Sequence, residues 1–152
     1  MKHFQTIILA SAVTLLTFAS PAIQAHSDEP NTPKARHGGQ VRVAGVNNFE
    51  LVVSKVSSDA KETPIVVFVT DRAGTNVSTV GTSGTATILA GKTKATVALV
   101  PDGDNRLKST TNFASTADMK VVVSIALSGK ANEQARFTPL AIEKPENAGH
   151  KH

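Results

Sequence analysis

The chain contains no cysteine, tryptophan or tyrosine, and six phenylalanines are its only large aromatic side chains. Without cysteine it can form no disulfide framework, zinc finger, iron–sulfur cluster or thiol nucleophile. Charge is moderate, because 16 Lys and Arg against 12 Asp and Glu give a formal net charge of +4. The apolar content of 40% is too high for a wholly disordered chain. A length of 152 residues therefore indicates one small globular domain without thiol chemistry.

The longest apolar run lies near the N-terminus, over residues 4–19, after a short basic start and before several small residues. This order is typical of a secretory signal peptide over residues 1–25, cleaved after Ala25 or, alternatively, after Ala22. A transmembrane anchor is the other interpretation, but the run is short for the roughly 30 Å of a bilayer core. We therefore expect an exported protein of the bacterial periplasm, with a mature chain over residues 26–152 and no stable membrane insertion.

The mature chain has two polar ends and a body with period-two alternation of apolar and polar residues. Residues 26–38 and 139–152 contain proline and charge and little apolar surface, so we expect a flexible leader and a flexible C-terminal tail. Turn residues bound seven strand candidates in the body, at 40–43, 49–54, 65–69, 85–88, 94–99, 121–127 and 134–137. The pattern predicts an all-β domain over residues 39–138, a single seven-stranded antiparallel immunoglobulin-like β-sandwich.

The predicted core is aliphatic, with few aromatic side chains. Val, Ile and Leu supply most of it, together with four phenylalanines: Phe49, Phe68, Phe113 and Phe137. The segment 65–69 is apolar at every position, as in a strand that is buried on both faces. We therefore expect Phe68, in the middle of this segment, to be a core residue.

Residues that could perform catalysis are scarce. An acyl-transfer enzyme needs a nucleophile beside a general base, but every histidine of the mature chain lies in or at the edge of a polar end. The stretch 81–85 lacks the final glycine of a nucleophile elbow, and no glycine pattern leads from a strand into a helix to hold a phosphate. The acidic stretch 102–105 departs from the EF-hand pattern and is typical of an ordinary turn. The sequence therefore predicts a protein that is not an enzyme.

The histidines are the better chemical signal. If signal cleavage makes His26 the first residue, its α-amine and imidazole can hold one metal ion together, an arrangement that suits Cu(II). Asp28 could add an oxygen ligand, and His37 a further imidazole where the chain enters the first strand. His150 and His152 form a second pair at the other end. These residues are candidate ligands for Cu(II) or another divalent transition metal, and the alternative is that they are solvated side chains without a ligand.

Several short segments carry a resemblance to a known group of proteins. They begin with His-Gly-Gly, and they are residues 37–39, 50–52, 69–74, 84–89, 97–101, 105–107, 121–124 and 135–138. In these segments the chain resembles small exported β-sandwich proteins that are encoded beside heavy-metal efflux pumps of the resistance–nodulation–division type. A similar segment is present at the front of some periplasmic adaptor subunits of these pumps. The resemblance implies a periplasmic accessory role in metal resistance, and only His37 in these segments matches a ligand position.

Three classes of function remain open from the sequence. The first is an accessory protein of heavy-metal efflux that binds metal and contacts a periplasmic adaptor subunit of a pump. The second is a non-catalytic interaction module of the cell envelope without a metal site. The third is attraction of the basic mature chain to anionic lipids or polyanions, which is weaker because the basic residues are scattered. Nucleic-acid binding is disfavoured, since export argues against it and no strand combines aromatic and basic residues.

Overall fold

The computed structural model describes residues 33–142, and every helix or strand among them is a β-strand. The strands are β1 (Gln40–Ala44), β2 (Asn47–Val53), β3 (Ser57–Asp71), β4 (Ser83–Ala90), β5 (Thr93–Pro101), β6 (Arg106–Ser115), β7 (Lys120–Ala126) and β8 (Asn132–Phe137). All neighbouring strands pair antiparallel. The predicted all-β antiparallel class is confirmed, but the described residues contain eight strands and the prediction of seven was wrong.

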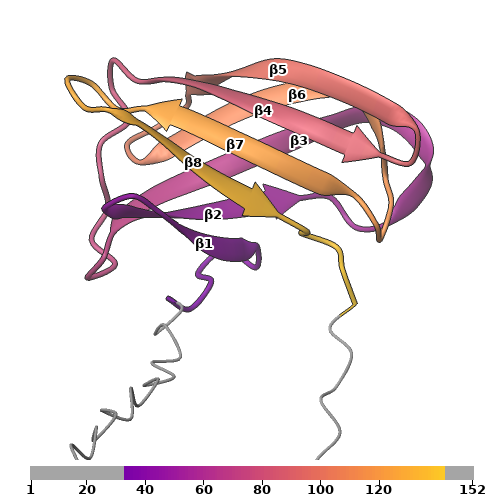
Figure 1. Cartoon of the computed structure of the whole chain (residues 1–152), viewed down its shortest axis with the longest axis horizontal. Helices are drawn as coiled ribbons and strands as arrows, with labels where there is room; N and C mark the ends of the chain where they lie inside the picture. The colour runs from indigo at the N-terminus through magenta and orange to yellow at the C-terminus, as the bar shows by residue number, and fades with distance from the viewer. Residues whose placement is uncertain (1–32, 143–152) are drawn as a thin grey trace, which may run out of the picture.

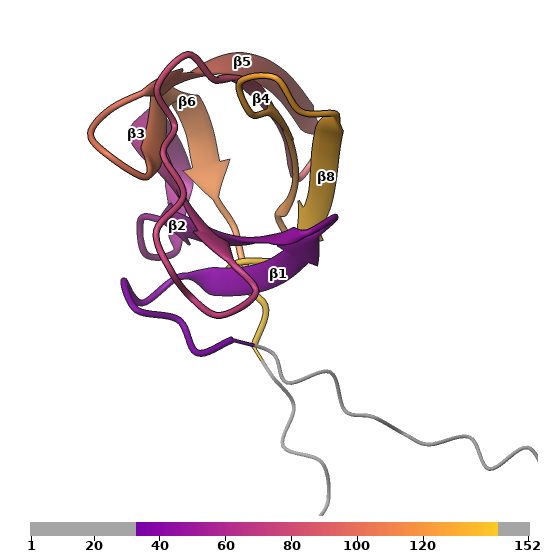
Figure 2. The same cartoon turned by 90° about the vertical axis from the view of Figure 1, so that its left-hand side faces the viewer.

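The eight strands form one sheet in the order β1-β2-β3-β6-β5-β4-β7-β8. The sheet curls until β1 and β8 lie beside each other, so the molecule is nearly barrel-shaped (Figure 1 and Figure 2). Side chains hold this seam, because the Glu133 carboxylate accepts hydrogen bonds from Val46 N–H at 2.8 Å and Asn47 Nδ2 at 2.6 Å. Gln40 Oε1 also accepts one from Thr138 N–H at 2.8 Å. One rolled sheet does not confirm the expected immunoglobulin-like sandwich.

Strand β6 is the strand that the sequence pattern missed. Leu107 and Phe113 are buried on its inner face, but the inner positions between them are Ser109 and Thr111. Two apolar residues six positions apart do not produce the alternation by which a strand is recognised. β6 nevertheless pairs with β3 over most of its length, so it belongs to the middle of the sheet.

The core lies inside the rolled sheet and is mainly aliphatic, as expected. Three of the four predicted phenylalanines are buried there: Phe49, Phe113 and Phe137. The prediction that Phe68 belongs to this core was wrong, because it is only half-buried. Val67 and Val69 on either side of it are buried, and successive side chains of a strand point to opposite faces. Phe68 therefore lies on the outer face of β3, where it becomes part of the candidate site.

Strand β5 connects the strands β1, β2, β3 and β6 to the strands β4, β7 and β8. It pairs with β4 from Thr93 to Leu99, but with β6 only through Val100↔Lys108 and Pro101↔Leu107. The rest of β5 therefore has one edge that no described strand covers. Within residues 33–142, no helix has the length and apolar character needed to cross a membrane.

Candidate functional site

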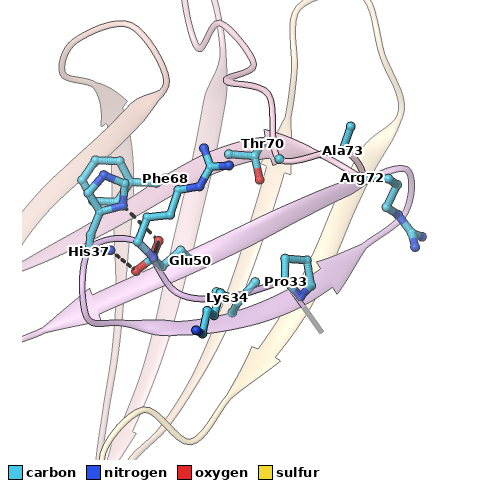
Figure 3. A pocket seen from close by; sticks show the side chains of 11 residues that line it. Pro33, Lys34, His37, Glu50, Phe68, Thr70, Arg72 and Ala73 are labelled. Carbon is cyan, nitrogen blue, oxygen red and sulfur yellow. Dashed lines mark hydrogen bonds and ion pairs between the residues drawn. The ribbon is translucent and has the colours of Figure 1, made fainter. Parts of the chain in front are cut away.

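A row of neighbouring side chains crosses the outer face of β1, β2 and β3. The register pairs Val41 with Glu50, and Glu50 with Phe68. Side chains directly opposite each other in antiparallel strands lie on the same face and contact each other. The segment 33–39, which precedes β1, runs along this face and brings His37 over Phe68 (Figure 3). Residues 33–38 belong to the expected leader, and here they are attached to the body.

Glu50 is the residue that attaches this segment. Its Oε1 accepts hydrogen bonds from the backbone N–H of His37 at 2.7 Å and of Gly39 at 3.1 Å. Its Oε2 accepts one from the backbone N–H of Arg36 at 3.0 Å and lies 2.9 Å from Nδ1 of the His37 ring. Glycine is needed at position 39, because a Cβ there would collide with the carbonyl oxygen of Leu51. One carboxylate therefore fixes three backbone N–H groups within residues 36–39 and one imidazole.

These hydrogen bonds also set the charge of Glu50. Burial by itself would raise the pKa of its carboxyl group, whose side chain is only 8% exposed. The hydrogen bond from the His37 side chain and those from the three backbone N–H groups outweigh burial and bring the pKa below its ordinary value of 4.5. Glu50 is therefore ionised at neutral pH and can only accept hydrogen bonds. Its neighbour Nδ1 must then carry the proton, which leaves the lone pair of a neutral His37 ring on Nε2.

The His37 ring is held from a second direction as well. It stacks on Phe68 with ring centroids 3.6 Å apart and an angle of 5° between the planes. Its side chain is 41% exposed, and among residues 33–142 only Nδ1 of its two ring nitrogens has a hydrogen-bond partner. Histidines that bind metals typically donate the other ring N–H to a carboxylate, which fixes the ring and raises its basicity. The hydrogen bond to Glu50 and the stack on Phe68 thus fix the direction of the ring and leave Nε2 without a hydrogen-bond partner among residues 33–142.

His37 and Phe68 border a pocket of about 320 Å³ between segment 33–39 and the turn after β3 (Figure 3). Its charged lining comprises three cationic side chains and one carboxylate: Lys34, Arg36, Arg72 and Glu50. The Arg36 guanidinium lies against the turn, because its Nη2 is 2.7 Å from the place that a Cβ of Gly74 would occupy. Arg72 turns away from His37, and its Nη2 donates a hydrogen bond to the carbonyl oxygen of Gly45 at 2.6 Å (Figure 3). The pocket therefore has an aromatic wall, and Lys34 and Arg36 are its cationic side chains without such a bond.

Only one of the five predicted metal ligands can be placed. His26, Asp28, His150 and His152 lie outside the described residues, and His37 lies at the pocket. In residues 33–142 no group of three or more His, Cys, Asp or Glu side chains is arranged to hold a metal ion. Within that range, His37 therefore offers a metal one nitrogen, and the remaining ligands would have to come from elsewhere.

Sequence reasoning identified His37 but missed both residues that fix it. Glu50 lies in a strand between apolar neighbours, and its outward position gave no sign of a partner 13 residues earlier. A signal was available, because an antiparallel register of β1, β2 and β3 places Glu50 and Phe68 side by side in front of the His-Gly-Gly motif. No protein-family model, curated protein or solved structure matches the chain. The resemblance to proteins of metal efflux systems therefore stays a prediction.

Proposed function

We propose that the protein is an exported, non-enzymatic accessory protein of heavy-metal resistance or efflux, which binds copper or another divalent transition metal through His37. The observation that supports this proposal is the carboxylate–histidine pair of Glu50 and His37, which engages Nδ1 and leaves the lone pair on Nε2 of a ring whose side chain is 41% exposed. Imidazole nitrogen suits Cu(II), Zn(II) and Ni(II). Glu50 acts here as a positioning residue for the ligand.

A histidine–carboxylate pair also occurs in catalytic triads, so the surroundings of His37 matter. A triad requires a nucleophile within hydrogen-bond reach of the imidazole. Among the described residues that line the pocket, the one hydroxyl is that of Thr70, and there is no serine or cysteine. Thr70 is paired with Asn48 in the sheet, and among the described residues no hydrogen bond joins it to His37. A binding role agrees better with this lining than a catalytic one.

The terminal residues complete the proposal. His26, Asp28, His150 and His152 are candidate additional ligands, supplied from either end of the mature chain. A periplasmic adaptor subunit of a metal efflux pump is the proposed partner, to which the loaded protein would pass its metal. Both statements rest on the sequence, and the Glu50–His37 geometry adds a rigid nitrogen ligand on the folded body to them.

Calorimetric titration of the mature protein with Cu(II), Zn(II) and Ni(II) at neutral pH tests the proposal. The informative variant is His37→Phe, because phenylalanine retains the stack on Phe68 and the backbone N–H bonds to Glu50 but has no nitrogen. We expect a loss of affinity of at least about tenfold for the preferred metal. Variants with alanine at His26, or at both His150 and His152, measure how much of the metal affinity comes from the two chain ends. No heat with any of the three metals, or wild-type affinity in His37→Phe, contradicts the proposal.

An interaction module without a metal site is the second candidate, and one observation favours it. From Thr93 to Leu99, β5 has an edge that no described strand covers. Extended peptides add to such edges through main-chain hydrogen bonds. Capture of a pump adaptor that persists in chelator and in His37→Phe would support this candidate over metal binding.

A further inference from the structure

The hairpin of β5 and β6 opens directly after its turn. The two strands pair only through the two residue pairs next to the turn, and then they part. On its other edge, β5 pairs with β4 without a register shift over residues 93–99. Along these residues, every second backbone N–H and C=O of β5 points away from β4. No described strand accepts or donates the hydrogen bonds that these groups can make.

This open edge lacks most features that protect a free strand. Natural edges are usually protected by proline, by bulges, by short strands or by charged side chains, especially lysine. Residues 93–99 contain no proline and no bulge, and Lys94 is their one charged side chain. The edges of β1 and β8, in contrast, lie beside each other and are joined by side chains at the seam. The edge of β5 is therefore a regular surface with which a further strand can pair.

Apolar surface is left uncovered along the same edge. Leu99 is buried, but Ala95 and Val97, which point to the same inner face of β5, are only half-buried against the core. The inner positions of the neighbouring strand β6 are Ser109 and Thr111, which are also half-buried. A strand that pairs with β5 would cover Ala95 and Val97 with its own inward side chains. Those side chains should be apolar, because they remove apolar surface from water.

The charged side chains around the edge are positive. Lys92 precedes β5, Lys94 lies on its outer face, and Lys108 lies on β6 at the point where the two strands part. All three are exposed, and none belongs to an ion pair among the described residues. The carboxylate nearest to this point in the chain, that of Asp102, is paired with Arg106 at 2.9 Å. Acidic side chains on a bound segment would therefore complement the edge.

A hollow of about 410 Å³ lies where β5 and β6 part. Ala98, Val100 and Pro101 give it an apolar lining from β5, and Lys108 and Thr110 line it from β6. Because β6 occupies the place beside Val100, a strand that is added to β5 must end there. The hollow can hold an apolar side chain at that end.

We propose that the open edge of β5 binds an extended acidic segment of another protein, in which apolar and acidic residues alternate and proline is absent. The segment pairs with residues 93–99 through main-chain hydrogen bonds, for which proline lacks the donor. Its apolar side chains cover Ala95 and Val97, and its carboxylates face the three lysines. This inference rests on the second candidate function, the interaction module, and names its partner. It does not depend on metal binding by His37.

A second copy of the chain fits this edge less well. Pairing of two β5 edges would bring the lysines of both copies to one surface, where like charges repel. No carboxylate of residues 93–99 could compensate, because that stretch has none. The charge therefore favours an acidic partner over self-association.

Fluorescence anisotropy of a labelled peptide, as long as the open edge and with alternating valine and glutamate, tests the inference on the mature protein. One control peptide has the same composition with the valines and glutamates in two separate blocks, and another has lysine in place of glutamate. The protein variant is Lys94→Glu, and Lys120→Glu is its matched control. Both lysines are exposed and lie opposite Leu89, but Lys120 belongs to β7, on the far side of β4 from the open edge.

We expect the alternating acidic peptide to bind at least about tenfold more tightly than either control peptide, because only this peptide combines alternation with negative charge. Lys94→Glu should weaken its binding about fivefold, since an attraction is replaced by a repulsion, and Lys120→Glu should match the wild type. Hydrogen exchange followed by NMR should show that every second N–H of residues 93–99 exchanges more slowly in the complex. Attraction between charges alone would not produce this pattern.

Three results would overturn the inference. The first is the absence of binding by the alternating acidic peptide, and the second is equally tight binding of either control peptide. The third is slow exchange of the edge N–H groups in the free protein, because the edge is then already covered. Protection that depends on protein concentration would assign the cover to a second copy, and protection that does not would assign it to another part of the same chain. Binding of the peptide should be unchanged in His37→Phe, so failure of this inference and failure of the metal proposal are separate results.

Discussion

The substitution Glu50→Gln tests how segment 33–39 is attached, because it removes the charge and nearly preserves the shape. The glutamine oxygen can replace Oε1 and keep the bonds from the backbone N–H of His37 and Gly39. The amide nitrogen then faces the backbone N–H of Arg36, from which it cannot accept a hydrogen bond. It can bond to His37 only if the ring changes tautomer and accepts at Nδ1.

The expected loss of stability follows from the hydrogen bonds that glutamine keeps and those that it loses. One hydrogen bond to a charged acceptor is lost and the remaining ones lose their charge, and bonds to charged groups contribute about 1.5–3 kcal/mol each. Segment 33–39 lies at the surface and can partly rehydrate, so we expect a loss of about 1.5–2 kcal/mol in the free energy of unfolding at neutral pH. For a domain of this size that corresponds to a decrease of about 6–12 °C in melting temperature.

The dependence of this loss on pH distinguishes the mechanism from a packing defect. The pKa of Glu50 in the folded chain is below its ordinary value of 4.5, so its charge stabilises the fold above that pH. The contribution is lost as the pH falls through the folded pKa, where the wild type comes to resemble the glutamine variant. Thermal melting followed by circular dichroism, at neutral pH and in steps of falling pH below 4.5, measures both effects. The control Glu62→Gln removes a charge from an exposed position of β3 and should change stability by less than about 0.5 kcal/mol. If the difference between the wild type and Glu50→Gln stays the same over the whole pH series, or if the control loses as much stability, the charge of Glu50 does not attach the segment.

Two further predictions concern the body of the fold. Phe49→Ala should cost about 3–5 kcal/mol because Phe49 is fully buried, whereas Phe68→Ala should cost only about 1–2 kcal/mol because Phe68 is half-buried on the outer face. Urea unfolding of the two variants checks this, and equal costs would place Phe68 in the core after all. Gly45→Ala should cost about 2–3 kcal/mol, since residue 45 has φ +54° and a Cβ there would collide with the Glu133 carboxylate at the seam. Gly91→Ala is the matched control in a turn with φ +56° and open space, and an equal cost in both variants would show that the seam contact contributes nothing.

The sequence predicted most of the strands because their inner positions are apolar and their outer ones polar. The prediction failed where the interior departs from this rule, as in β6, whose inner face has Ser109 and Thr111 between its two apolar residues. It also failed at Phe68, because an uninterrupted apolar segment does not reveal which residue points inward. Phe68 points outward because Val67 and Val69 on either side of it point inward, and the His37 ring covers it there.

The site was harder to predict than the fold, because it depends on contacts between residues distant in the sequence. His37 was singled out from its place before the first strand, but its fixed orientation comes from Glu50, 13 residues later. That pairing requires the β1–β2 hairpin and the reversal of the chain at Gly38, where φ is +75°. The four other candidate ligands lie outside the described residues, so they stay predictions from the sequence alone.

The proposed metal site depends on Glu50, which fixes the His37 tautomer and leaves the lone pair on Nε2. Nitrogen-15 NMR of the imidazole of His37, recorded at neutral pH before and after addition of Zn(II), tests it most directly. We expect Nδ1 to carry the proton in both states, and the Nε2 resonance to move from the position of a neutral lone-pair nitrogen to that of a metal-bound one. A proton on Nε2 in the metal-free protein, or an Nε2 resonance that does not respond to Zn(II), would contradict it.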